Sequence, residues 1–344
     1  MGLGRYVARK TIYTAILLLV IIAFNFVLFQ VLPFVISCPT MTIANCAAHL
    51  YAPEQPPRGV QNVTLWISVV RARIVHSYGF DQPLYVRFID YYRNMLTFNF
   101  GYNIGDVLGG TVLQTIQIRT PYTLLLLGSS TIASFVIGIG LGVVASAKRG
   151  KILDVSSLAA LLFIQSLPVF FLGAMLELSQ LGLTGSFYVS WGTATIGLEG
   201  WDVYIATLQA LFLPFLTLTL VGVGGVFLTQ RAVMIDTLGE DYIIMARAKG
   251  VPERTVLYKH ALRNAVLPIV TAFALSVGFI LSGAIITETV FQWNGLGYAI
   301  YTSVEASDFP FAQAMFFIIT LMVLIALFAA EISYGFLDPR VSRD

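Results

Sequence analysis

Long uncharged runs dominate the pattern of hydrophobic and polar positions along the chain. A membrane-spanning helix needs about 20 apolar residues, and the runs lack the period-two alternation of membrane barrel strands. Apart from His49 in the first run and Glu177 in the third, the runs carry no charge or histidine and cover Thr11–Ala52, Thr120–Ala147, Val155–Leu198, Val203–Gln230, Asn264–Thr287 and Phe309–Ala330. The pattern therefore predicts an all-α, polytopic membrane protein with six transmembrane helices.

Composition supports a membrane protein over a large soluble domain. Of the 344 residues, 57% are hydrophobic and 11% are charged, and the mean hydropathy is +0.82. Soluble domains have roughly a quarter of their residues charged. The first apolar run is far longer than the roughly 7–15-residue core of a cleaved signal peptide, so we interpret it as a retained helix.

The distribution of Lys and Arg predicts the orientation in the membrane. Cytoplasmic loops are enriched in these residues. With the N-terminus inside, the cytoplasmic segments contain Arg5, Arg9, Lys10, Lys148, Arg149, Lys151, Arg231, Arg247, Lys249, Arg254, Lys259, Arg263, Arg340 and Arg343. The remaining ones, in a long segment after the first helix, are Arg58, Arg71, Arg73, Arg87, Arg93 and Arg119. We therefore predict a multi-pass protein of the plasma membrane with both termini cytoplasmic. The net charge of +2 then reflects topology in the lipid bilayer, and no nucleic-acid partner is needed.

These spans divide the chain into three parts. Residues 1–34 form the N-terminal cytoplasmic end and the first transmembrane helix. Residues 35–118 form an extracytoplasmic segment, and residues 119–344 hold the other five helices with a charged cytoplasmic loop at 231–265.

Part of the extracytoplasmic segment is predicted to form an amphipathic helix. Apolar side chains recur at helical spacing at Leu84, Phe88, Tyr91, Tyr92 and Met95, with charged residues between them. Such a helix either lies on the membrane surface or packs across the transmembrane bundle.

Two features of this segment suggest covalent modification. Cys38 and Cys46 are the two cysteines of the chain, and their placement outside allows either a disulfide or free buried thiols. Asn62 begins an Asn-Val-Thr tripeptide, which is a weak glycosylation signal.

Glycines and prolines mark the transmembrane helices. The sequences "GIGLG" at 138–142 and "GVGG" at 222–225 favour close helix packing in lipid, with direct substrate contact as the alternative. Pro168 and Pro214 should each break backbone hydrogen bonds and bend a helix.

Motifs for catalysis are absent from the sequence. It contains no G-x-x-x-x-G-K-[ST] phosphate loop, no H-E-x-x-H motif and no Cys/His cluster suited to zinc. We therefore expect no enzyme activity, no metal and no cofactor in this chain. Glu177, Glu288 and Glu331 fall towards helix ends, which argues against a proton- or ion-driven transporter.

The cytoplasmic segment between the fourth and fifth predicted spans contains residues typical of a helix end and of a helix start. "EDYIIMARAKG" predicts a short amphipathic helix, and Gly250 suits the left-handed position just after its end. Pro252 suits the first turn of a second helix. The segment is either a rigid protrusion or a helix pair anchored at lipid headgroups by its basic side chains.

This segment, "DYIIMARAKGVPERTVLYKHALRNAVLPIV", resembles the cytoplasmic loop of permease subunits in ATP-binding-cassette (ABC) importers. The family pattern A-x-A-x-G with a later L-P matches Ala246, Ala248, Gly250, Leu267 and Pro268. "ARAKG" and "HALRNA" resemble the dipeptide/oligopeptide (nickel) family in particular. The long external segment and the closing "LDPR" resemble its B-type subunit. The chain departs from the family in two external places, namely the stretch "LPFVISCPT" after the first helix and Asn294, which stands in place of a proline before "GLG".

The resemblance implies a type I ABC importer fold and a division of labour between subunits. Two ABC ATPase subunits would bind ATP and Mg, a homologous second permease subunit would complete the pathway, and an extracytoplasmic solute-binding protein would deliver the substrate. The residues implied to couple to the ATPase are Asp241, Ala246, Ala248, Lys249, Gly250, Val251, Pro252 and Glu253. Those expected to brace the loop are His260, Arg263, Asn264 and Pro268.

The substrate that the resemblance implies is an oligopeptide, with short oligosaccharides as the alternative. External aromatic side chains would stack on sugars, although an interfacial aromatic belt explains them equally well. They are Phe187, Tyr188, Trp191, Trp201, Tyr204 and Trp293. A secondary transporter or channel is the alternative from another class.

Overall fold

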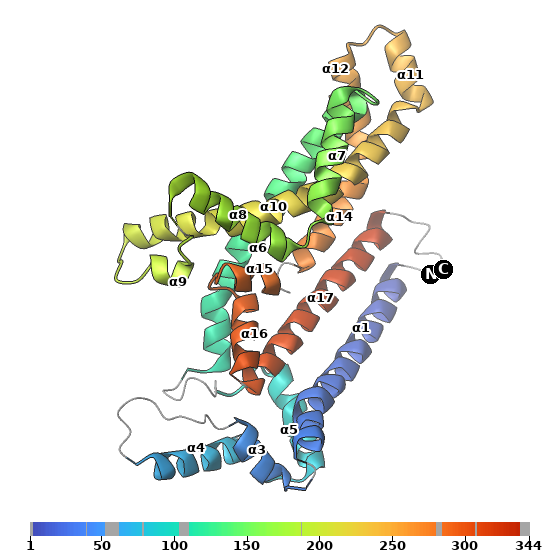
Figure 1. Cartoon of the computed structure of the whole chain (residues 1–344). Coiled ribbons are helices and arrows are strands. Elements are labelled where there is room, and N and C mark those ends of the chain that lie inside the picture. Colours follow the sequence, from blue (N-terminus) through green and yellow to red (C-terminus); the bar gives the residue numbers. More distant parts are fainter. Residues whose placement is uncertain are drawn as a thin grey trace. The chain divides into compact units, whose positions relative to one another are not determined.

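The computed structural model describes residues 3–38, 40–51, 62–77, 79–102, 110–186, 188–279, 284–306 and 308–337, which are mainly helical (Figure 1). The elements are α1 (Leu3–Phe26), η1 (Val27–Val31, π-helical), α2 (Leu32–Ser37), α3 (Ile43–Tyr51), α4 (Val63–Ser77), α5 (Leu84–Leu96), α6 (Val112–Ala147), α7 (Ile152–Ser166), α8 (Val169–Thr184), α9 (Trp191–Ala194), α10 (Trp201–Leu238), α11 (Asp241–Ala248), α12 (Glu253–Thr255), η2 (Val256–Ala261, π-helical), α13 (Leu262–Ala265), α14 (Leu267–Phe279), α15 (Ile285–Val290), α16 (Leu296–Glu305) and α17 (Phe309–Leu337).

The long helices confirm a helical membrane protein. Among the described residues, Gly4–Ser37, α6, α10 and Phe309–Ala329 are long and apolar enough to span a membrane, and α7 with α8 forms a further, bent span. The remaining predicted span, 264–287, corresponds to α14 and to residues 280–283, which lie outside the described ranges. That sixth span stays a prediction.

The chain packs as two compact units. The first comprises residues 1–121 and 299–344, and the second comprises residues 122–298. This division follows packing and not membrane topology, so the boundaries predicted at residues 34 and 118 remain predictions.

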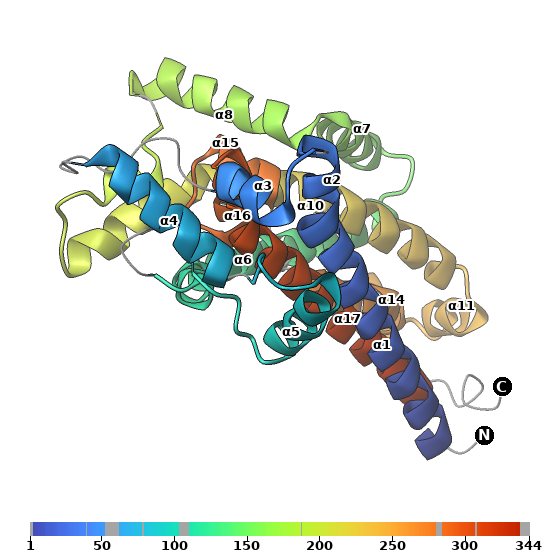
Figure 2. The same ribbon diagram turned by 90° about the horizontal axis from the view of Figure 1, so that it is seen from below.

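In the first unit, the N-terminal and C-terminal long helices lie side by side (Figure 1 and Figure 2). The predicted amphipathic helix is present as α5 and packs on α1: Phe88 and Tyr91 meet the ring of Phe26 edge-on, at centroid distances of 5.2 and 5.4 Å. The Tyr92 hydroxyl also donates a hydrogen bond to the Leu19 carbonyl. The second of the two predicted placements, packing across transmembrane helices, therefore holds.

The two cysteines lie just after α2 and within α3. Cys38, which follows α2, and Cys46 in α3 are joined in a disulfide. Cys46 is buried in a small apolar cluster with Phe34 and Phe80. Asn62 is exposed just before α4, where its side-chain oxygen accepts a hydrogen bond from the Leu65 N–H at 3.2 Å. Glycosylation of Asn62 remains a prediction.

In the second unit, two glycines of α6 lie in close contact with α10. This contact confirms the packing interpretation for part of "GIGLG". A Cβ added at Gly138 would lie 2.7 Å from Cβ of Val226, and one at Gly142 would lie 2.8 Å from Cβ of Gln230. These glycines are four residues apart, so they share one face of α6. Gly140, between them, faces open space.

We predict that Gly138→Ala destabilises the protein although alanine is the better helix former. Overpacking against Val226 should cost about 2 kcal/mol, and thermal unfolding in detergent should show a melting temperature several degrees lower. Gly140→Ala is the matched control, because it gains helix propensity without a clash and should melt at or above the wild-type temperature. Equal behaviour of the two variants would contradict the close approach at Gly138.

The two predicted proline bends have different outcomes. α7 ends at Ser166, Pro168 precedes α8, and the two helices meet at 104°. Pro214, in contrast, lies inside α10, which continues as one helix from Trp201 to Leu238. Pro214 does not end its helix, and the bend predicted there remains a prediction. Its ring is accommodated within the helix, as prolines in membrane helices often are.

The α15–α16 turn closes over a buried glutamate. Glu288 is inaccessible to solvent, and its carboxylate accepts hydrogen bonds from the Thr123 hydroxyl at 3.0 Å and the Tyr298 N–H at 3.1 Å. A Cβ at Gly295 would lie 2.3 Å from this carboxylate, and one at Gly297 would lie 2.8 Å from the Ile285 backbone. The glycines of "NGLG" therefore allow the turn to pack closely against Glu288 and Ile285. Glu288 holds this turn in place within the second unit.

Candidate functional site

The candidate site is the hairpin of α11 and α12, which forms one end of the second unit (Figure 1). Gly250 has a φ of +76°, as predicted for the position after a helix. Its N–H donates to the Arg247 carbonyl at 2.9 Å, and the Val251 N–H donates to the Ala246 carbonyl at 3.3 Å. This pair of bonds is the Schellman ending of a helix. It fixes the direction in which the chain leaves α11.

The second helix begins immediately after the corner. Pro252 is the N-cap of α12 and not a first-turn residue, which corrects the prediction by one position. Its φ of −56° suits proline, and its carbonyl accepts from the N–H groups of Thr255 at 2.8 Å and Val256 at 3.0 Å. Proline has no backbone N–H, and this causes no loss here because an N–H at a helix start has no carbonyl acceptor within the helix.

A charge pair joins the two sides of the corner. The Arg247 guanidinium donates two hydrogen bonds to the Glu253 carboxylate, at 2.8 and 3.2 Å. These bonds hold the pKa of Glu253 below its usual range, so the carboxylate is ionised at neutral pH. The pair is well exposed, and exposed pairs contribute only about 0–1 kcal/mol. It therefore sets the shape of the corner more than its stability.

A buried apolar cluster anchors the base of the hairpin to the long helices. It joins Ile243 of α11, Val256 and Ala261 of η2, Met234 of α10 and Val143 of α6. Because these side chains are closely packed, the hairpin and the C-terminal ends of α6 and α10 resist separate movement. The site is thus a stiff protrusion, and a headgroup anchor would not need this internal core.

Of the four predicted bracing residues, Asn264 has a bracing contact. Its amide donates to the Tyr242 hydroxyl of α11 at 2.8 Å. His260 and Arg263 make no side-chain hydrogen bond within the described part of the chain, and Pro268 is exposed near the start of α14. For these three, bracing remains a prediction.

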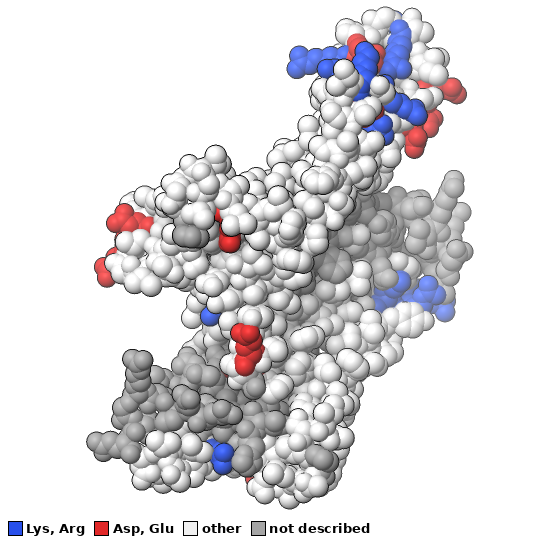
Figure 3. Space-filling model, viewed as in Figure 1, with Lys and Arg blue, Asp and Glu red and all other residues white. Residues whose placement is uncertain are grey.

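The exposed surface of the hairpin combines charge with apolar side chains. Figure 3 shows Lys and Arg gathered at this end of the second unit, where Lys249, Arg254 and Lys259 are exposed. Ile244 and Met245 are also 54% and 60% exposed. Sequence reasoning missed these two side chains. The available signal was that "YIIMA" holds more apolar residues than one helix face can bury.

A second missed feature is an ion pair at the base of the same region. Asp154, near the start of α7, is 1% exposed. Its carboxylate accepts from Arg231 Nε at 2.6 Å, from Arg231 Nη2 at 2.8 Å and from the Gly150 N–H at 2.9 Å. The pair ties the α6–α7 turn to α10, just before α10 leads into the hairpin.

Comparison with known proteins identifies the family. Residues 138–343 match the model of the "binding-protein-dependent transport system inner membrane component" family. The oligopeptide transport system permease protein AppB of Bacillus subtilis is 33% identical over 79% of this chain and 84% of its own length. The di/tripeptide permease DppB of Pseudomonas aeruginosa is 29% identical over 79% and 85%, and the glutathione permease GsiC of Escherichia coli K12 is 33% identical over 88% and 95%. The chain belongs to the family of inner membrane components of binding-protein-dependent transport systems.

Proposed function

We propose that this chain is the permease subunit of an ATP-driven ABC importer and forms part of the translocation pathway for oligopeptides. The observation that carries the proposal is the stiff hairpin at Gly250 and Pro252, in a chain whose relatives are named as peptide permeases. The hairpin would insert into an ATPase subunit and transmit its closing and opening to α6 and α10.

The chemistry of ATP belongs to other subunits in this proposal. Two ABC ATPase subunits would bind ATP and Mg, and the described residues of this chain contain no group of three or more potential metal ligands. A homologous second permease subunit would complete the pathway, and an extracytoplasmic solute-binding protein would deliver the peptide. The hairpin and both termini would lie in the cytoplasm, while the exposed Glu199 and Asp202 would lie outside.

The relatives favour peptides over oligosaccharides, and one aromatic side chain considered for sugar stacking is unavailable. Trp293 is completely buried, and its indole N–H donates to the Tyr122 carbonyl at 3.0 Å. It packs inside the protein and presents no surface to a sugar. Among the aromatic residues first considered for sugar stacking, Trp201 and Tyr204 have exposed rings in the described part of the chain.

Reconstitution of the importer tests the proposal. The chain would be co-expressed with its partner permease and ATPase subunits, placed in liposomes with the solute-binding protein, and supplied with a labelled tripeptide or trisaccharide. We expect uptake of the peptide that depends on ATP inside the liposome. Uptake by this chain alone, driven by an ion gradient without ATP, would establish a secondary transporter instead. ATP-dependent uptake of the sugar alone would refute the substrate class.

A further inference from the structure

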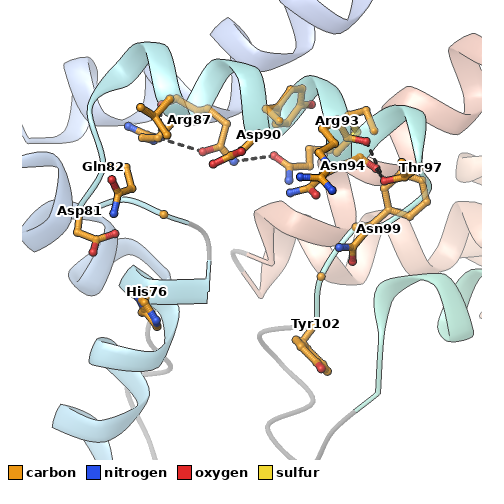
Figure 4. A pocket seen from close by; sticks show the side chains of 18 residues that line it. His76, Asp81, Gln82, Arg87, Asp90, Arg93, Asn94, Thr97, Asn99 and Tyr102 are labelled. Atoms are coloured by element: carbon orange, nitrogen blue, oxygen red, sulfur yellow. Dashed lines mark hydrogen bonds between the residues drawn. The ribbon is translucent and has the colours of Figure 1, made fainter.

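A cavity of about 790 Å³ lies beside α5 in the first unit. Figure 4 shows Arg87 and Asp90 along α5 and Thr97 just after its end, with Asp81 on one side of the cavity and Tyr102 on the other. Sites for small molecules usually enclose about 300–1,000 Å³. The volume therefore suits a ligand of a few residues or rings.

A buried stripe of α5 and the polar face beside it both line the cavity. Arg87, Tyr91 and Met95, spaced by four residues, form the buried stripe, and Tyr91 packs against Phe26 of α1. Asp90, Arg93 and Asn94 form the adjoining polar face. The amphipathic pattern noticed in the sequence thus has a polar side with a cavity of its own.

The floor of the cavity is built from buried polar groups. Arg87 is 4% exposed, and its Nη2 donates to the Gln30 carbonyl and to Gln30 Oε1, both at 3.0 Å. Gln30 in turn donates to Gln313 of α17 at 2.9 Å. The guanidinium also lies over the rings of Phe34 and Phe80, at 5.6 and 4.8 Å. Burying such a charge is costly unless it is well held, and these contacts fix it in place.

The lining carries both signs of charge. Arg87 and Arg93 are cationic, and Asp81 and Asp90 are anionic. A phosphate or dicarboxylate would therefore meet two carboxylates, and a polyamine would meet two guanidinium groups. A neutral sugar would pair with none of these charges. A ligand with one positive and one negative end satisfies the set, and amide groups of the lining, such as that of Asn94, suit a peptide bond between the ends.

We propose that this cavity binds the zwitterionic main chain of a short peptide, with the peptide ammonium at Asp81 and Asp90 and its carboxylate at Arg93 and Arg87. For the class of ligand, this inference rests on the proposed function. It adds that the permease itself recognises free peptide ends outside the membrane, before the translocation pathway.

Direct binding to the full-length chain in lipid nanodiscs, without the solute-binding protein, tests the inference. Radiolabelled trialanine, N-acetyl-trialanine and trialanine amide would be compared by equilibrium dialysis. We expect saturable binding of trialanine, weakened at least tenfold when either end is blocked. Charge-assisted hydrogen bonds to the ends are the strongest contacts available to so small a ligand.

Two exposed lining residues provide the variants, since neither is part of the buried floor. Arg93→Gln and Asp90→Asn should each weaken trialanine binding at least tenfold. Arg93→Gln should add little to the loss already caused by amidation, because both changes remove the same ion pair. Matched controls are Arg149→Gln and Asp202→Asn, which change exposed charges outside the cavity and should bind as the wild type does.

Several results would overturn the inference. They are the absence of saturable binding at millimolar trialanine, equal affinity for the blocked peptides, and variants that bind trialanine normally but fail to capture the solute-binding protein. The last result would make the cavity a protein contact. Uptake by the reconstituted importer separates the two proposals. If the importer takes up peptide but the chain does not bind trialanine, this inference is wrong and the proposed function stands. An importer that takes up no peptide refutes the proposed function.

Discussion

Gly250→Trp is expected to abolish peptide uptake while ATP hydrolysis continues. Gly250 has a φ of +76°, which costs any other L-residue about 1–2 kcal/mol. No atom lies within 4 Å of an added Cβ, so an indole would project from the tip of the hairpin. That space is where we place the groove of the ATPase subunit. The measurement is ATP hydrolysis and labelled-peptide uptake in the same liposomes.

Gly250→Ala separates strain from bulk. It carries the same backbone penalty but adds a single methyl group, so we expect partial uptake and a slightly lower melting temperature. A bulky residue at a buried position of the hairpin, such as Ile243, would instead lower the stability of the fold. If Gly250→Trp transported peptide at the wild-type ratio of uptake to hydrolysis, the assignment of this corner as the coupling contact would be wrong.

Asp154→Asn is expected to have the largest effect on stability. The carboxylate accepts three hydrogen bonds, two of them from Arg231. An asparagine amide offers one oxygen and turns an NH₂ group towards the guanidinium. Breaking a buried ion pair from one side costs about 3 kcal/mol, so the melting temperature in detergent should fall clearly, and the α6–α7 turn should become more susceptible to proteolysis.

Two further variants make this test specific. Asp202→Asn makes the same chemical change at an exposed position of α10, where the helix terminus contributes about 0.3–1 kcal/mol, and it should have a small effect. The double variant Asp154→Leu, Arg231→Met leaves neither charge behind and should recover much of the lost stability. A wild-type melting temperature for Asp154→Asn would show that the pair does not stabilise the fold.

Local signals in the sequence predicted local structure well. Length and polarity located the long helices, and the α7–α8 break followed from Pro168. The left-handed residue after α11 followed from Gly250. In each case the cause lies within a few residues of its effect, such as a missing N–H, a missing Cβ or an uncharged run. Pro214 lies within the continuous helix α10, so the bend predicted there stays a prediction.

Contacts between distant residues were not predictable in this way. Asp154 and Arg231 are 77 positions apart, and nothing in the sequence near either residue indicates its partner. Glu288 was placed at a helix end, yet its burial depends on Thr123 and the turn at Gly295, which only the fold brings together. The polar cavity beside α5 likewise depends on Gln30 and Gln313, far from α5 in the sequence.

The π-helical stretch η2, residues Val256–Ala261, has a consequence for the evolution of the loop. A π-helical turn is an α-helix that has accepted one additional residue. The loss of one residue there would return the stretch to ordinary α-helix and leave the Gly250 corner in place. A deletion within α11 would instead rotate every later residue about the helix axis by roughly 100°. Related permeases can therefore differ in length by one residue after the corner more easily than before it.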